Sequence, residues 1–109
     1  ELHATIARHT SALVEGMCGI AARRGVPFTA DSAGSMFGFF FRAEPVRCYA
    51  DALTADVALF RRFFHAALER GVYLAPSAFE AGFMSSAHGD AEIALTLERL
   101  DGALADARR

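Results

Sequence analysis

Lysine, asparagine, glutamine and tryptophan are all missing from this 109-residue chain. An enzyme that forms a Schiff base with a carbonyl substrate or with pyridoxal phosphate needs a lysine amine to do so. The chain by itself therefore cannot carry out Schiff-base chemistry. The sequence also begins with Glu1 rather than methionine. Together these two observations lead us to expect a piece of a longer protein.

Basic stripes and long apolar runs are lacking as well. Eleven basic residues stand against 13 acidic ones, which gives a formal charge of -2, and no cluster could neutralise a run of phosphates. No stretch reaches the roughly 18 apolar residues that a membrane helix requires, and the N-terminus has no signal-peptide pattern. We therefore expect neither nucleic acid nor a membrane as a partner, and a cytoplasmic or organellar location.

Patterns typical of metal or nucleophilic sites are also absent. Cys18 and Cys48 stand in a chain without a secretion signal, so we expect both to be reduced and buried. No two histidines have the i, i+4 spacing that would aim two imidazoles at one metal, so no metal site is expected. The four histidines are His3, His9, His65 and His88. We expect His65 at the edge of the core and His88 in the cap of the last helix.

Enough apolar side chain is present for a folded protein. Hydrophobic residues make up 53% of the sequence, and a chain of this length can bury about two thirds of its surface in one core. Residues 1–109 are therefore expected to form a single domain, in which a helix over 1–24 leads into a small domain over 25–109. Gly25 and Pro27 end that helix.

Two strands are predicted next, at Phe28–Asp31 and Met36–Arg42, joined by the turn-prone residues 32–35. The second strand is apolar on both faces, which is typical of a strand covered on both sides, either by its own helices or by another domain. Gly38 within it marks either a close backbone approach or a bulge.

The rest of the chain predicts two further helices and two short strands. Residues 43–55 are expected to form a loop, and Asp56 can cap a helix that ends at Gly71. Short strands are predicted at Val72–Ala75 and Gly82–Ser85, followed by a helix from Gly89. The whole pattern predicts an α+β fold, in which a small, mainly antiparallel sheet packs with three helices.

One carboxylate stands out on physical grounds. Glu80 lies in the apolar segment 75–83, where a charge is costly unless it meets a partner. It is either exposed or bound to backbone N–H groups of the turn, or it points into a cleft shared with another domain. Ser77 in the same segment lacks a Gly-x-Ser-x-Gly context, and no Gly-rich phosphate loop is present, which disfavours hydrolase and nucleotide-binding functions.

Four runs carry a resemblance to a known family: residues 34–41, 48–49, 60–64 and 71–85, the last followed by Ala87 and His88. In this order and near this spacing, the chain resembles the C-terminal part of the glutamate-1-semialdehyde 2,1-aminomutase family. The resemblance covers essentially the whole chain. Residues 71–85 are its most specific part.

The resemblance implies a class-III aminotransferase of fold type I, which acts as a homodimer with pyridoxal 5'-phosphate. Such an enzyme converts the small molecule glutamate 1-semialdehyde to 5-aminolevulinate in tetrapyrrole biosynthesis. The large domain carries the Schiff-base lysine, and the C-terminal small domain covers the site. By position, Glu80 matches the family's active-site glutamate, and Ser77 is a weaker candidate. The resemblance thus implies an inactive fragment that binds no cofactor and whose partner is its own large domain.

Two alternatives remain open at this point. The chain could be a free-standing interaction or dimerisation module descended from such an enzyme. It could also be the small domain of another class-III aminotransferase that acts on a different amine.

Overall fold

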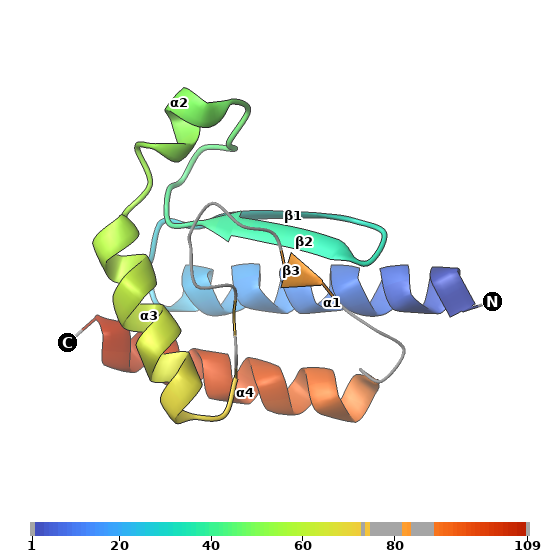
Figure 1. The fold of residues 1–109 in the computed structure, drawn as a ribbon. Coiled ribbons are helices and arrows are strands. Elements are labelled where there is room, and N and C mark those ends of the chain that lie inside the picture. Colours follow the sequence, from blue (N-terminus) through green and yellow to red (C-terminus); the bar gives the residue numbers. More distant parts are fainter. Residues whose placement is uncertain (1, 73, 75–81, 84–88, 109) are drawn as a thin grey trace.

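A computed structural model describes residues 2–72, 74, 82–83 and 89–108 of the chain. The fold is α+β, with a three-stranded antiparallel sheet in the order β1-β2-β3 (Figure 1). The elements are α1 (Leu2–Arg23), β1 (Thr29–Ala33), β2 (Met36–Phe40), α2 (Tyr49–Ala52), α3 (Val57–Glu69), β3 (Gly82–Phe83) and α4 (Asp90–Ala107). The predicted fold class is confirmed.

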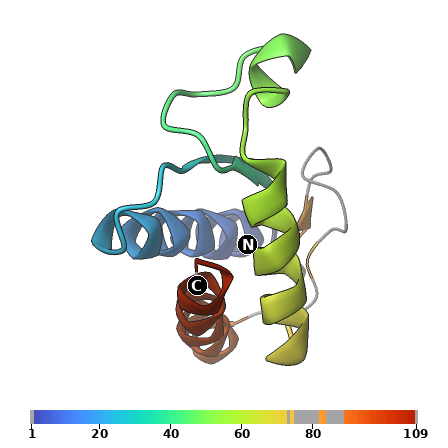
Figure 2. The same cartoon turned by 90° about the vertical axis from the view of Figure 1, so that its left-hand side faces the viewer.

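Helix α1 lies beneath the hairpin of β1 and β2, with α3 and α4 on its other sides (Figures 1 and 2). Its buried face carries Leu13, Met17 and Ile20, spaced as one face of a helix. The helix ends as predicted, because Gly25 adopts a positive φ of 66° and the N–H of Val26 bonds back to the carbonyl of Ala21.

The β1–β2 hairpin differs from the prediction in the bounds of both strands, since β2 ends at Phe40 and not at Arg42. The predicted strand Phe28–Asp31 is wrong in its bounds, because Ser32 and Ala33 still pair with Phe37 and Met36. The connection needs only two residues, since Gly34 takes a φ of 60°. The pairing of Asp31 with Gly38 is continuous in register, so Gly38 does not form a bulge.

The inner face of the sheet holds an aromatic cluster that ties it to α3. The ring of Phe39 lies 5.7 Å from that of Phe60 and 5.9 Å from that of Phe63, and Phe41 lies 5.5 Å from Phe63. Phe28 stacks on Phe39 at 5.5 Å. Such pairs add to the stabilisation that burial of their area provides. Among the described elements, helices cover only this inner face of β2, where the sequence predicted cover on both sides.

Residues 43–55 contain the short helix α2, where the sequence predicted only a loop. It stands away from the sheet at the top of Figures 1 and 2. The predicted count of three helices is therefore one too low. A helix of four residues leaves no hydrophobic period to detect, so its stability comes from the polar contacts described below.

The last two helices confirm the predictions. The carboxylate of Asp56 accepts the N–H of Leu59 at 2.9 Å and caps α3, while Glu92 accepts the N–H of Gly89 at the start of α4. Between them, Val72 and Leu74 lie outside any strand, so the strand predicted at Val72–Ala75 is not formed at its described residues. Gly82–Phe83 forms β3; the remainder of both predicted strands lies outside the described residues.

Candidate functional site

The two predicted site residues, Ser77 and Glu80, lie outside the described residues, so their roles stay predictions. The described residues on either side of them belong to the core and to the sheet. Leu74 is 8% exposed and belongs to the core. Gly82 and Phe83 pair with Phe37 and Met36 at the edge of the sheet. The described residues that flank the predicted site are therefore a core residue on one side and the sheet edge on the other.

Cys18 does not suit a nucleophilic role. Cys18 and Cys48 are both free, as expected. Burial raises the pKa of the Cys18 thiol, and the nearby carboxylate of Glu15 raises it further, so the reactive thiolate is disfavoured. Cys48 is exposed, which contradicts the prediction that both cysteines are buried; it precedes α2, which stands clear of the core.

The histidines form no metal site among the described residues, where no group of three potential ligands occurs. His9 instead pairs through its Nε2 with Asp90 Oδ1 at 3.1 Å, joining α1 to the first turn of α4. His65 is exposed and lies against the ring of Phe64 at 5.4 Å, as expected for an edge residue. The side chain of His3 and the whole of His88 lie outside the described part of the chain.

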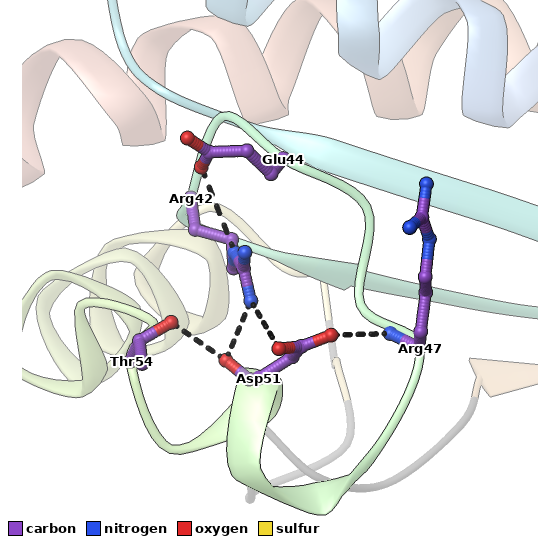
Figure 3. A network of polar contacts seen from close by, with 5 residues as sticks. All are labelled: Arg42, Glu44, Arg47, Asp51 and Thr54. Carbon is purple, nitrogen blue, oxygen red and sulfur yellow. Dashed lines mark hydrogen bonds and ion pairs between the residues drawn. The ribbon is translucent and has the colours of Figure 1, made fainter.

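A polar cluster around Arg42 is a notable feature of the described part of the chain (Figure 3). The Arg42 side chain is 17% exposed, and its Nη1 donates to the carbonyl of Asp51 at 3.0 Å. The same Nη1 lies 3.5 Å from the Asp51 carboxylate, while Nε lies 3.8 Å from that of Glu44. Because the charged groups of Arg42 meet partners within its own segment, this arginine anchors α2 to the end of β2.

Asp51 completes the cluster from the helix side. Its Oδ2 accepts the backbone N–H of Arg47 at 3.0 Å, and this hydrogen bond, together with the charge of Arg42, holds the pKa of Asp51 below its usual value. Thr54 Oγ1 also donates to the Asp51 carbonyl at 2.7 Å. The sequence did not predict this cluster, since an arginine and an aspartate nine residues apart carry no periodic signal.

The outer face of the sheet, which looks away from α1, is hollowed in two places. One hollow of about 300 Å³ is lined by Asp31, Gly38 and Phe40 together with Pro45 and Val46 beyond the strand. A second, of about 290 Å³, shares Asp31 and Gly38 and extends to Met36. Asp31 is the one charged side chain among the residues that line either hollow.

Pyridoxal phosphate, which the resemblance implies, does not fit these residues. The chain has no lysine to hold it covalently. The residues that line the two hollows include the carboxylate of Asp31, the hydroxyl residues Thr29 and Ser32 and apolar side chains, but no cation to balance the charge of a phosphate. None of the helices in the described part is long and apolar enough to cross a membrane.

Two curated proteins illustrate what the chain is similar to in sequence. It is 63% identical over 103 residues to the glutamate-1-semialdehyde 2,1-aminomutase of Gemmatimonas aurantiaca, an overlap of 94% of this chain and 24% of that protein. It is 52% identical over 92 residues to the enzyme of the same name from Nitrosospira multiformis, covering 84% of this chain and 22% of that protein. The chain thus spans about a quarter of the length of these relatives. No protein-family model matches it.

Solved structures share the fold. A glutamate-1-semialdehyde-aminomutase from Pseudomonas aeruginosa PAO1 superposes with a TM-score of 0.83 at 18% identity, over 97% of this chain and 23% of that one. A variant of it in complex with PMP also has a TM-score of 0.83 at 18% identity, over 96% and 23%. An omega-transaminase from Sphaerobacter thermophilus has a TM-score of 0.82 at 23% identity, over 98% and 24%. At these identities the likeness concerns the fold alone.

Proposed function

We propose that this chain forms the C-terminal domain of a glutamate-1-semialdehyde 2,1-aminomutase, since it is 63% identical to one such enzyme over 94% of its own length. That identity is the observation that carries the proposal. The reaction is the conversion of glutamate 1-semialdehyde to 5-aminolevulinate. Bound pyridoxal phosphate supplies the aldehyde or amine through which an amino group moves. The lysine for it must come from the parent chain outside this sequence, so the chain alone is inactive.

Glu80 is the residue that we propose this domain brings to the reaction. In the parent enzyme its carboxylate would face the substrate and hold an ammonium group through a charge-assisted hydrogen bond. Such a bond is strong only where water is excluded, and a site between two domains provides that shelter. Ser77, three residues earlier in the same segment, would shape the same pocket.

The proposed partners follow from this placement. They are the remaining domain of the parent chain, a second subunit in a homodimer, and the small substrate, in the cytoplasm. Nucleic acid and membranes are not among them, since the formal charge of -2 gives no attraction to phosphates.

Replacing Glu80 by glutamine in the full-length enzyme tests the proposal. We expect turnover of glutamate 1-semialdehyde to fall about ten- to a hundredfold, because the hydrogen bond to the ammonium loses its charge. The absorbance of the bound cofactor should not change, since Glu80 is not proposed to touch the lysine. A suitable control is Glu69→Gln, which removes a carboxylate from the exposed end of α3.

Equal activity of Glu80→Gln and the wild type would remove Glu80 from the mechanism. The competing function is that of another class-III aminotransferase that acts on a different amine, the alternative left open by the sequence. Assays of the full-length protein with glutamate 1-semialdehyde, and with simple amines and 2-oxo acids, separate the two. Faster turnover of the amines would replace the aminomutase by a transaminase.

A further inference from the structure

We propose that residues 43–55 form an order–disorder element, which unfolds and refolds while the rest of the fold stays intact, and that the side chain of Arg42 holds it in the ordered state. These residues, the α2 segment, contain helix α2 and join the end of β2 to the residue that caps α3. Local unfolding of this kind is typical of the parts of a fold that change conformation.

Helix α2 is too short to be stable by itself. It has four residues, whereas isolated helices shorter than about 12–15 residues are marginal in water, because the first turn fixes many dihedral angles for one hydrogen bond. Cys48 at its N-cap makes no side-chain hydrogen bond to the helix N-terminus. Ala52 is buried but is not a member of the hydrophobic core cluster. The helix therefore depends on polar contacts with neighbouring residues of the chain.

Arg42 makes two of these contacts through one nitrogen atom. Its Nη1 donates to the backbone carbonyl of Asp51 at 3.0 Å and lies 3.5 Å from the Asp51 carboxylate (Figure 3). Because the Arg42 side chain is only 17% exposed, water and salt screen this pair less than a pair on the open surface. The same carboxylate accepts the backbone N–H of Arg47 at 3.0 Å. Arg42 and Asp51 thus connect the start of the α2 segment to its helix.

The two ends of the α2 segment are joined without the side chain of Arg42. The N–H of Asp56 donates to the carbonyl of Phe41 at 3.1 Å, and Phe41 is buried in the core. The Asp56 carboxylate caps α3. The segment can therefore open while β2 and α3 stay in place. Because Pro45 and Val46 line the larger hollow, opening of the segment also removes part of that lining.

Hydrogen exchange at individual amides of the full-length protein tests the proposal. The amides of residues 52–55 bond to carbonyls of residues 48–52, and the amide of Arg47 bonds to Asp51, so these amides report the opening of the segment. Arg42→Met keeps an apolar stem and removes the guanidinium. It should speed exchange of all these amides together, by about ten- to a hundredfold, whereas the amides of Asp56 and Leu59 should keep their rates.

Two further variants separate the role of Arg42 from a general loss of charge. Arg47→Met is the matched control, because it removes a guanidinium from the same segment that is exposed and points away from Asp51 (Figure 3); it should leave the rates unchanged. Asp51→Asn keeps the carbonyl that Arg42 binds but removes the charge, so it should speed the same amides less than Arg42→Met does. Its effect should be smaller in the Arg42→Met background, since both changes act on one contact.

The wild type alone also tests the proposal. Its amides at residues 52–55 should share one free energy of opening, below that of the most protected amides of α1 and α4. Exchange as fast as in an unstructured peptide would show that α2 is not ordered and would overturn the proposal. Unchanged rates in Arg42→Met, or a faster rate at Arg47 alone, would also overturn it. So would an equal acceleration in α1, α3 and α4, because the segment would then not open on its own.

Discussion

The ionisation of Asp101 links the packing of two helices to pH. Its Oδ1 accepts from Nε of Arg24 at 2.7 Å, joining α4 to the end of α1. This hydrogen bond and the arginine's charge lower the pKa of Asp101 from its ordinary 3.8. Because the folded-state pKa is the lower one, the stabilisation is fully present above the unfolded-state pKa and is lost as pH falls through the folded-state value.

Asp101→Asn should therefore lower the free energy of unfolding at neutral pH, and the difference from wild type should shrink as pH falls below 3.8. We expect a small effect, because the side chains of Arg24 and Asp101 are 34% and 39% exposed and water screens the pair. Urea titrations between pH 2 and pH 7 measure it. Glu98→Gln, at an exposed position on the same helix, is the control. A difference that persists undiminished at low pH would refute the assigned cause.

Single residues were predictable where their local sequence determines their role. Asp56 was identified as a cap and confirmed, since capping depends on the residues that follow directly. Arg42 and Asp51 were missed, because their contact depends on how the chain turns between them. Glu80 was singled out by its apolar surroundings, and its role stays a prediction.

Helices α1 and α4 pack closely enough that one glycine between them matters. A Cβ on Gly16 would lie 2.4 Å from Leu97 Cδ1, whereas one on Gly19, a turn later in α1, would meet only Arg23 Nη1 at 3.4 Å. Gly19→Ala should stabilise the chain by about 0.5–1 kcal/mol through helix propensity. Gly16→Ala has the same gain, but overpacking costs about 1–3 kcal/mol, so its net effect should be destabilising.

Urea unfolding followed by far-UV circular dichroism measures both substitutions, and a double-mutant cycle tests the contact. In a Leu97→Ala background, the penalty of Gly16→Ala should disappear, since the clashing methyl groups are gone. A penalty of equal size in both backgrounds would show that Leu97 is not the cause.

Whole elements were predictable in proportion to their length and periodicity. The three long helices repeat their apolar residues over several turns, and their predicted extents were confirmed within a few residues. The end of β1 and the existence of α2 were not predicted correctly. Pairing across a two-residue turn determines the extent of β1, and contacts outside the helix stabilise α2, so neither depends on a repeat within the element.

At the scale of the whole molecule, the buried residues form one core shared by α1, α3, α4 and the sheet. Apolar content predicted this single core from the sequence. That the described helices all lie on the inner side of the hairpin could not be derived in the same way. The sequence indicated that β2 needs cover on both sides, but whether its own helices supply it depends on tertiary packing.

A shared core predicts that these elements unfold together. Phe63 is 3% exposed and contacts Phe39 and Phe41, so Phe63→Leu should lower the free energy of unfolding by about 1–2 kcal/mol. Native-state hydrogen exchange should show the same loss for the most protected amides of α1, β2, α3 and α4, since they exchange only through global opening.

Helix α2 should behave differently, because within the described chain it has hardly any contact with other helices or strands. Its amides are expected to exchange through local opening, with rates that Phe63→Leu leaves unchanged. Leu68→Ala, at a 47% exposed position on α3, is the matched control and should alter none of the protected amides appreciably. If α3 lost protection in Phe63→Leu while α1 and α4 kept theirs, the helices would open as separate units and the single cooperative core would be refuted.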